Sequence, residues 1–353
     1  MYPERWQPES LARETPITDR ARLAAVAKVG ARAARDLREV MGERGVPLAA
    51  YLAVVVQDID SMGRFLGGQP LSTGRGKIKI EVIPNEHRRL SQVLVSLAGK
   101  QGQALRDPAL LGVPVYAGGD DLLAFTPAAT ALRAAEEANQ PIPPELPRAS
   151  TAVLFFHHHA SIQQAMRTAR HLLEDAKDKV SGKHALAVGY LRRSGVSEAS
   201  IQPWAGPDGE STAVLFGLFA KDAEYRLSPR LAADLERDAG ELEQLRAESE
   251  RLHRPELYLG ELTRLVRRHT STQSDGAGRD GGGSGDRSQA AREALESARR
   301  AGAALDWLGR HERAPRETPG EAPGPYVAAR IAVFLRQEAA ASRAGGARGR
   351  EAG

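Results

Sequence analysis

The sequence of 353 residues contains no cysteine. This absence excludes disulfide bonds, thiolate nucleophiles and zinc sites built from cysteine. No apolar run approaches the roughly 20 residues that a membrane-spanning helix needs, and the polar segment 1–16 lacks the apolar core of a signal peptide. We therefore expect a cytoplasmic protein that has no membrane partner.

Aromatic residues are scarce as well, at 5%, whereas hydrophobic residues of all kinds make up 41% of the chain. A chain of this length and composition can form two domains of ordinary size. The net charge of +4 is compatible with a phosphate-rich ligand or a nucleic-acid partner, but many arginine-rich proteins have such a charge without binding nucleic acid. Composition leaves the function open, so the motifs have to decide it.

The apolar pattern predicts a sheet with helices between residues 51 and 191. Short β-branched runs indicate strands, and two apolar arms around a Gly-Gly-Asp-Asp tetrad indicate a hairpin. The fold class that we expect is α+β, a ferredoxin-like palm of order β-α-β-β-α-β with an antiparallel sheet and both helices on one face, followed by an α-helical C-terminal domain. The strands are predicted at 51–56, 113–125 (the hairpin), 150–156 and 184–191, and the helices at 85–106 and 161–181.

Outside the palm, charged helical patterns and polar linkers replace the strands. An extended lead-in at 1–17 precedes a predicted helix at 18–44, and further helices are predicted at 229–250, 255–268, 289–309 and 325–342. Core candidates among them are Trp307, Ile331, Val333 and Phe334. The predicted division is a lead-in and helix at 1–48, a palm domain at 49–196, a helical domain at 197–343 with a disordered linker at 270–289, and a disordered tail at 344–353.

Four aspartates are expected to meet at one end of the sheet. Asp58 and Asp60 directly follow the first strand, and Asp120 and Asp121 lie in the hairpin turn. Magnesium prefers oxygen ligands and usually takes one or two carboxylates together with substrate phosphates. Carboxylates from two adjacent strand ends suit two Mg²⁺ or Mn²⁺ ions, which can activate an attacking hydroxyl and neutralise a leaving pyrophosphate.

The two glycines before Asp120 have a separate role, because Gly118 and Gly119 lack a Cβ and let phosphate approach the backbone. Each motif also has an ordinary interpretation. An aspartate pair after a strand is often a cap or a turn former, and Gly-Gly-Asp-Asp alone is compatible with a plain hairpin. The combination on adjacent strands favours the metal site.

A run of three histidines, His157 to His159, lies at the end of a predicted strand. Alternate residues of a strand face opposite ways, and no His-Asp dipeptide accompanies the run. We interpret it as a surface or half-buried feature rather than as a metal or nuclease site.

Several segments together resemble one protein family, the large subunit of type III CRISPR effector complexes. The segment from Tyr116 to Phe125 resembles its GGDD hairpin, and the segment from Asp58 to Gly68 resembles its D-x-D-x-M-G motif. Residues 87–94 and 182–195 resemble the helix between the motifs and the last palm strand of the III-B (Cmr) branch. The resemblance covers about 51–195. The GGDEF palm of diguanylate cyclases is related, but its motif ends in an acidic residue followed by phenylalanine, whereas in this chain Leu122 follows Asp121.

The resemblance implies a palm that binds ATP as substrate and makes cyclic oligoadenylates when the complex holds target RNA. It implies as partners other CRISPR effector subunits, with guide RNA and target RNA reached through the complex. The site residues that it implies are Asp120 and Asp121 as catalytic metal ligands, Asp58 and Asp60 as further metal ligands, and Gly118, Gly119 and Lys183 as nucleotide contacts.

Large subunits of this family begin with an HD nuclease domain, a first palm and a zinc-bearing insert, none of which is recognisable in this sequence. The sequence is then either a fragment or one half of a separately encoded pair, whose partner is a first-palm/HD chain. Two other functions stay open. One is a catalytically silent scaffold subunit of the same complex, and the other is a diguanylate-cyclase-like enzyme.

Overall fold

The computed structural model describes residues 6–14, 17–43, 50–73, 76–191, 197–206, 209–220, 228–269, 284–310, 312–313 and 325–335. The chain divides into two compact units, one made of residues 1–50 and 338–353 and the other of residues 51–337. The predicted tail at 344–353 and residues 270–283 of the predicted linker lie outside the described residues, whereas residues 284–289 of that linker are helical.

The first unit contains two helices, α1 (Pro8–Glu14) and α2 (Arg20–Glu43). Helix α2 confirms the helix predicted at 18–44. The extended lead-in is wrong at α1, where Leu11 packs against Leu23 and Ala27 of α2. This contact between two helices stabilises a short helix that the local sequence pattern alone does not indicate.

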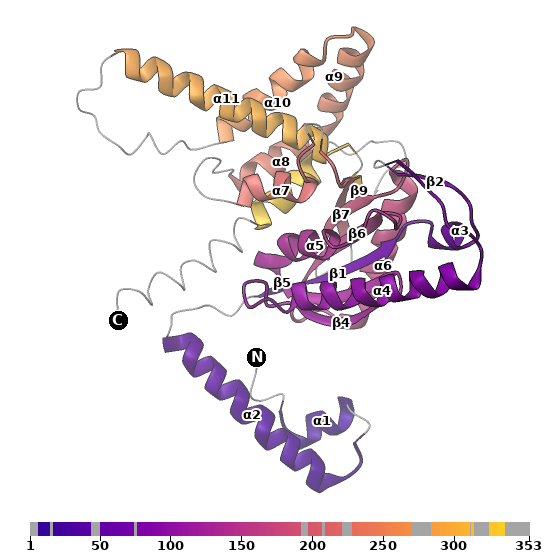
Figure 1. Ribbon diagram of the computed structural model, residues 1–353. Helices are drawn as coiled ribbons and strands as arrows, with labels where there is room; N and C mark the ends of the chain where they lie inside the picture. Colours follow the sequence, from indigo (N-terminus) through magenta and orange to yellow (C-terminus); the bar gives the residue numbers. More distant parts are fainter. Residues whose placement is uncertain are drawn as a thin grey trace. The chain divides into compact units, whose positions relative to one another are not determined.

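The second unit is built on a seven-stranded sheet in the order β4-β5-β1-β6-β7-β8-β9 (Figure 1). Strand β1 is antiparallel to both β5 and β6, whereas β6 and β7 are parallel. Strands β2 (Leu71–Thr73) and β3 (Gly76–Ile78) pair with each other in a separate two-stranded antiparallel sheet. The strands of the large sheet are β1 (Tyr51–Ile59), β4 (Val113–Gly118), β5 (Asp121–Pro127), β6 (Ala149–His157), β7 (Ala185–Leu191), β8 (Ser197–Pro203) and β9 (Glu312–Arg313).

The palm strands and helices predicted from the sequence are confirmed. The expectation of an antiparallel sheet is wrong at one pair, because β6 and β7 are parallel. Helix α6 (Ile162–Lys179) joins β6 to β7, and such a crossover returns the chain in the same direction. The predicted start of the helical domain also differs, because residues 197–203 form β8 and pair with β7. The sheet therefore continues past residue 196, and that predicted boundary falls inside the second unit.

Helices cover both faces of the sheet, not one as expected. Alternate residues of β1 point to opposite faces. Val54 and Val56 join the cluster of α6, whereas Ala53 and Val55 join the cluster of α5 (Ala131–Asn139), a helix that the sequence pattern did not predict. Helix α4 (Pro84–Leu105) lies with α5, since the Gln101 side chain donates to Gln57 of β1 and to the Ala138 carbonyl of α5. Helix α3 (Met62–Leu66) follows β1 directly, and the 3₁₀ turn η2 (Ala128–Thr130) precedes α5.

The C-terminal helices share one core with the α5 face of the sheet. Phe334, in a helical stretch at 326–335, lies 5.1 Å between ring centroids from Phe155 of β6 and 4.8 Å from Tyr51 of β1. Core candidates Ile331 and Val333 are buried as predicted, and Trp307 and Phe334 pack against the core. The other helices are α7 (Thr212–Ala220), α8 (Pro229–Arg237), α9 (Ala239–Arg251), α10 (Pro255–His269) and α11 (Ser284–Leu308).

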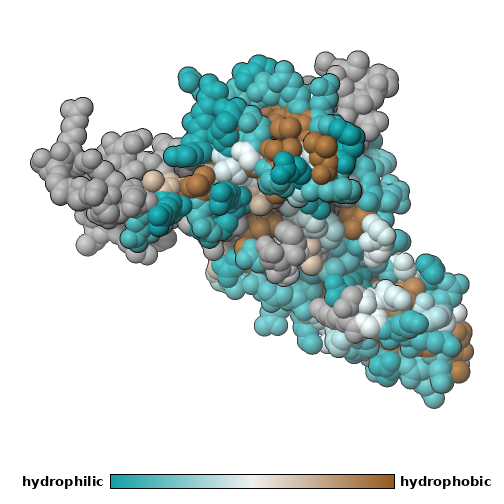
Figure 2. Space-filling view, turned by 90° about the horizontal axis from the view of Figure 1, so that it is seen from above, coloured by the Kyte–Doolittle hydropathy of each residue, from teal (hydrophilic) through white to brown (hydrophobic). Residues whose placement is uncertain are grey.

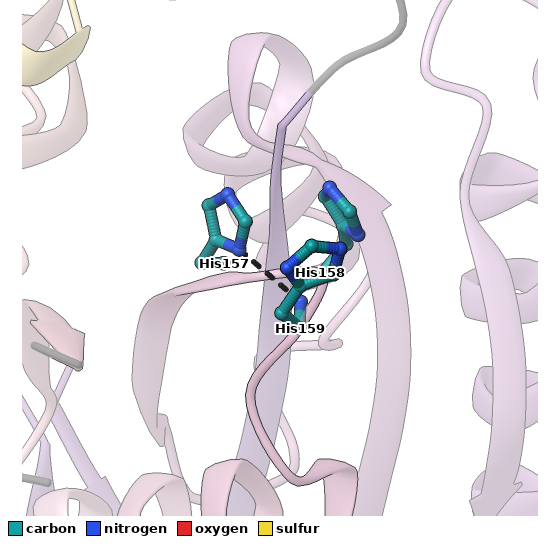
Figure 3. Close-up of side chains that lie close together, drawn as sticks. All are labelled: His157, His158 and His159. Atoms are coloured by element: carbon teal, nitrogen blue, oxygen red, sulfur yellow. Dashed lines mark hydrogen bonds between the residues drawn. The ribbon is translucent and has the colours of Figure 1, made fainter.

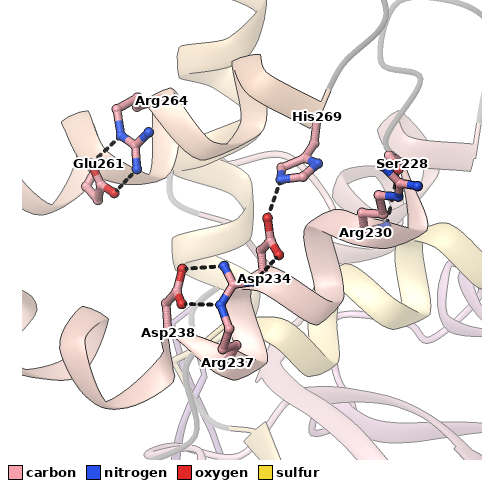
Figure 4. Close-up of polar contacts among 8 residues, drawn as sticks. All are labelled: Ser228, Arg230, Asp234, Arg237, Asp238, Glu261, Arg264 and His269. Atoms are coloured by element: carbon pink, nitrogen blue, oxygen red, sulfur yellow. Dashed lines mark hydrogen bonds and ion pairs between the residues drawn. The ribbon is translucent and has the colours of Figure 1, made fainter.

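Charged contacts join the ends of these helices (Figure 4). Asp234 of α8 binds Arg237 one turn later and the His269 ring at the end of α10, at 2.7 and 2.8 Å. The His269 carbonyl accepts the Ser228 N–H, just before α8. The helix predicted at 229–250 is divided into α8 and α9 at Asp238, whose backbone leaves the helical region there.

The face seen in Figure 2 is mostly hydrophilic, with hydrophobic patches among the hydrophilic residues. Exposed apolar side chains include Val113, Val115 and Tyr116 of β4 and Val95 of α4. Among the described residues, no helix is both long enough and apolar enough to cross a membrane.

Candidate metal and nucleotide site

Two of the four predicted aspartates are direct cross-strand partners. In the β1–β5 ladder Asp58 lies opposite Asp121, and the Ile59 N–H donates to the Asp120 carbonyl at 3.1 Å. Opposite residues of an antiparallel pair point to the same face. The carboxyls of Asp58 and Asp121 are within hydrogen-bonding contact of each other, with Asp120 beside them in the turn. The predicted meeting of these three residues is what the structure shows.

The turn between β4 and β5 consists of Gly119 and Asp120, because Gly118 and Asp121 are already paired in the ladder. Gly119 has a φ of +63°, whereas Asp120 is not among the non-glycine residues with positive φ. A two-residue hairpin with positive φ at its first central position requires glycine there. A Cβ at Gly119 would meet no atom within 4 Å, so the space above the turn is open.

The ammonium group of Lys177, at the end of α6, forms an ion pair with Asp58, one of the two paired carboxyls. Asp121 is an exposed residue, but its carboxyl faces Asp58. Burial raises the pKa of this carboxyl, and the neighbouring Asp58 and Asp120 raise it further, whereas Lys177 lowers it. Two carboxylates in contact repel each other unless a proton or a cation lies between them.

Asp60 is held in a different environment, at the junction of β6 and β7. It is 6% exposed, and its carboxylate accepts the Ser150 hydroxyl at 2.9 Å and the His184 N–H at 2.8 Å. The same Ser150 oxygen accepts the Ala185 N–H at 3.1 Å. Burial raises the pKa of Asp60 to about 6, although these hydrogen bonds and nearby lysines act in the opposite direction. Asp60 therefore ties β1 to the start of β6 and β7.

The pH dependence of unfolding should reflect this buried carboxyl. Its pKa is raised from 3.8 to about 6, so between these values the folded chain binds more protons than the unfolded chain. The free energy of unfolding of the metal-free chain is then expected to fall as pH rises through this range, by about 3 kcal/mol at most for this group. Asp60→Asn should reduce that slope, which urea unfolding in EDTA at pH 4, 5, 6 and 7 would measure. An unchanged slope in the variant would contradict the assignment.

The other predicted site residues line two separate pockets. Lys183 lines a pocket of about 690 Å³ with Asp60, Arg64, Arg148 and His184 among its walls. Lys183 and His184 both have positive φ, of 60° and 52°, which is uncommon for residues other than glycine.

Gly118 and Gly119 line a second pocket, of about 390 Å³, between the hairpin and α4. Its walls include Gly102, Arg106 and Tyr116. The two pockets thus place Lys183 with Asp60 and the two glycines against α4, and neither pocket is lined by all seven predicted residues.

Sequence reasoning missed the residues that anchor this site, namely Lys177, Ser150 and His184. Lys177 lies 119 residues from Asp58 in the sequence, and Ser150 lies 90 residues from Asp60. A lysine at the end of an amphipathic helix and a serine at the start of an apolar strand are both ordinary features. Their role becomes visible only when β1, β6 and α6 are packed together.

The donor set fits a hard divalent cation. Asp58 and Asp121 offer oxygen ligands, the pair already has the Lys177 cation against it, and the turn above is open. The fit is incomplete for an ion held by protein alone. Among the described residues, three or more histidine, aspartate or glutamate ligand atoms lie within 4.8 Å of one another only at His157, His158 and His159. A bound ion would need further oxygen ligands, which substrate phosphates commonly supply to Mg²⁺.

Comparison with known proteins gives a consistent result for this part of the chain. The sequence model of the family described as Cas10/Cmr2, second palm domain, matches residues 51–187. A curated relative, the CRISPR system Cmr subunit Cmr2 of Pyrococcus furiosus, is 30% identical over an alignment of 180 residues that covers 44% of this chain and 20% of the relative. The chain thus spans about a fifth of the length of this relative.

Two solved structures are also similar to this chain. One is the type III-B Cmr-beta bound to cognate target RNA, with 14% identity and a TM-score of 0.49, covering 84% of this chain and 40% of that one. The other is the Csm1–Csm4 cassette in complex with cA4, with 16% identity and a TM-score of 0.36, covering 72% and 35%. The family match coincides with the segment that carries the paired aspartates and the Gly-Gly-Asp-Asp turn. Residues 51–187 of this chain are therefore similar to the second palm domain of the Cas10/Cmr2 family.

Proposed function

We propose that this chain is the palm subunit of a cytoplasmic type III CRISPR RNA-guided effector complex, and that it converts ATP to cyclic oligoadenylates in antiviral defence. One observation carries the proposal. Asp58 and Asp121 lie opposite each other at the end of the β1–β5 ladder, beside a glycine turn with open space above it, within the matched palm domain.

In this proposal Asp58, Asp120 and Asp121 hold Mg²⁺ or Mn²⁺, and Asp60 holds the strand ends in place. Bound there, the cations would lower the charge of the reacting phosphates and help to activate the attacking hydroxyl. A ribose hydroxyl oxygen of one ATP forms a bond to the α-phosphorus of another. The bond from that phosphorus to the bridging oxygen breaks, pyrophosphate leaves with the electron pair, and the hydroxyl proton passes to water.

The lysines and the glycine turn have supporting roles in the proposal. Lys177 forms an ion pair with Asp58, and Lys183 lies with Arg64 in the larger pocket. Both ammonium groups would contact phosphate oxygens as point charges. Gly118 and Gly119 leave room for a nucleotide between the hairpin and α4.

Partners follow from the same proposal. The relative named above is a subunit of a CRISPR system, and we extend that to other effector subunits, guide RNA and target RNA, and a separate first-palm/HD chain. Strand β4 supports docking of another chain, because it is the edge strand of the sheet and exposes Val113, Val115 and Tyr116 next to the turn. Exposed apolar residues along a sheet edge are typical of a surface that another chain covers.

Incubation of the purified chain with labelled ATP and Mg²⁺ or Mn²⁺ tests the function. We expect oligoadenylate from the wild type and none from Asp120→Ala/Asp121→Ala, with a reaction in EDTA as the second control. Metal-dependent ATP binding without product, lost in the double variant, would indicate half of a site that needs its partner palm. Neither product nor binding would overturn the catalytic proposal and leave the scaffold function.

The scaffold function is the second candidate, and the core shared by the C-terminal helices and the sheet favours it. Such a core gives a rigid body on which neighbouring subunits can assemble. The same assay with GTP distinguishes the diguanylate-cyclase alternative, because conversion of GTP in place of ATP would support that enzyme.

A further inference from the structure

Three histidines at the end of β6 converge on one point (Figure 3). His157, His158 and His159 each present a ring nitrogen, and these nitrogens all lie within 4.8 Å of one another. The expectation that strand alternation separates the three side chains is wrong, because only His157 belongs to β6. His158 and His159 lie in the turn that follows.

The backbone of this turn is fixed on both sides. The Ala160 N–H donates to the His157 carbonyl at 2.7 Å, and Ser161 caps α6 by accepting the Gln164 N–H. His157 is paired with Tyr51 of β1 and meets its ring edge-on, with 5.2 Å between centroids. The His157 and His158 rings are stacked at 4.4 Å, and the His158 and His159 rings meet at 4.0 Å. The three imidazoles are therefore brought together before any ligand binds.

Imidazole nitrogen is a good ligand for Zn²⁺ and for the other late first-row transition metals, and a poor one for Mg²⁺. Zn²⁺ binds histidine nitrogen at about 2.0–2.1 Å in tetrahedral geometry, which places the nitrogens about 3.4 Å apart. The rings would thus have to close by somewhat more than 1 Å. His159 is exposed and the other two are half-buried, so the turn leaves space for that adjustment. The Nδ1 atom of His157 accepts the backbone N–H of His159 at 3.2 Å. To bind the metal, His157 would either give up this hydrogen bond or coordinate the metal through its other ring nitrogen, Nε2.

We propose that His157, His158 and His159 form a binding site for one transition-metal ion, with Zn²⁺ as the probe. Three imidazoles leave a fourth position for water or for a group of another molecule. This site is separate from the aspartates. In the β1–β6 ladder Tyr51 is opposite His157, whereas Asp58 is opposite Ser150. Seven residues of strand separate the two positions, which corresponds to about 23 Å.

The test is a Zn²⁺ titration of the full chain without an affinity tag, in competition with a chromophoric chelator at pH 7.5. The wild type is expected to bind one equivalent at this site. His159→Ala should raise the dissociation constant at least about tenfold, and His158→Ala/His159→Ala about a hundredfold, since loss of even an outer partner of a metal site costs 10–100-fold. Co²⁺ in place of Zn²⁺ should give visible absorption bands of a tetrahedral site, which the double variant should lack.

Two controls make the result specific. His171→Ala removes an exposed histidine of α6 and should leave Zn²⁺ binding unchanged. Asp120→Ala/Asp121→Ala should also leave it unchanged, which separates this site from the proposed Mg²⁺ site. Circular dichroism checks the fold of each variant. Because His159 is exposed, the single variant His159→Ala should disturb the fold less than the double variant. Equal Zn²⁺ affinity in the wild type and in His159→Ala and the double variant, or no binding by the wild type, would overturn the proposal.

Discussion

Asp58→Asn is expected to lower metal-dependent conversion of ATP by about 10³-fold, because it removes one of the two carboxylates that face each other across the β1–β5 ladder. A metal ion contributes several kcal/mol to the stabilisation of transition-state charge, and each 1.36 kcal/mol is tenfold in rate. The neutral amide is nearly the same size as the carboxylate. It should keep the strand register while losing most of the attraction for a divalent cation.

Asp60→Asn provides the sharper comparison, since sequence reasoning placed both residues among the metal ligands. The Asp60 carboxylate accepts hydrogen bonds from the Ser150 hydroxyl and the His184 backbone N–H. An asparagine oxygen can accept these bonds, so we expect a loss of about tenfold or less, much smaller than the loss of a ligand. Asp178→Asn changes the charge of an exposed aspartate beside Lys177 and should have no effect.

The measurement is the initial rate of product formation at saturating ATP over a range of Mn²⁺ concentrations. If the palm alone makes no product because it needs its partner chain, the affinity for ATP is measured over the same range of Mn²⁺ concentrations instead of the rate. A loss in Asp60→Asn as large as that in Asp58→Asn would make Asp60 a ligand, as the sequence motif predicts. Full activity in Asp58→Asn would remove the paired carboxylates from the proposed mechanism.

The parts of the palm that the sequence predicts are those whose patterns are local. Strand β1 begins with a continuous apolar run at 51–56, and the hairpin is marked by its glycines, so the meeting of Asp58 with Asp120 and Asp121 follows from the order of elements. Helix α5 was missed for a physical reason. Its buried face consists of alanines alone, namely Ala131, Ala134, Ala135 and Ala138, and small side chains give a weak periodic signal.

Strand β8 could not be predicted from the local sequence pattern, because its polar residues are buried by contacts with distant parts of the chain. Its residues Glu198, Ser200 and Gln202 are at most 1% exposed, although their polarity indicates a surface segment. Gln202 donates to the Leu308 carbonyl at 3.0 Å, and Glu198 accepts from Arg330 at 2.8 Å. Buried polar groups are tolerated where partners satisfy them, and these two partners, the Leu308 carbonyl of Gln202 and the Arg330 guanidinium of Glu198, lie more than 100 residues away. Asp60 and Ser150 in the candidate site are likewise buried polar residues whose hydrogen-bond partner is distant in the sequence, since 90 residues separate the two.

Phe155→Ala is the substitution that we expect to be most destabilising outside the site. Phe155 lies in the central strand β6 with no exposed surface, and its ring lies 5.1 Å from that of Phe334 at an angle of 52°. Truncation of a buried phenylalanine removes its transfer free energy and leaves a cavity, at a cost of about 3–5 kcal/mol. Val95→Ala, at a position that is 72% exposed, should change the free energy of unfolding by less than about 0.5 kcal/mol.

A double-mutant cycle of Phe155→Ala with Phe334→Ala tests whether the 326–335 helix packs on the sheet. Residues in contact give non-additive effects, and an aromatic pair is worth about 0.5–1.5 kcal/mol beyond its buried area. The free energies come from urea unfolding of the wild type, the two single variants and the double variant. They can be compared if the slope of the unfolding free energy against urea concentration is the same in all four chains. Strict additivity, with Phe155→Ala still strongly destabilising, would mean that the sheet buries Phe155 without this helix. A cost below about 1 kcal/mol for Phe155→Ala would contradict the shared core, because the loss of a fully packed phenylalanine ring leaves a cavity that costs more than this.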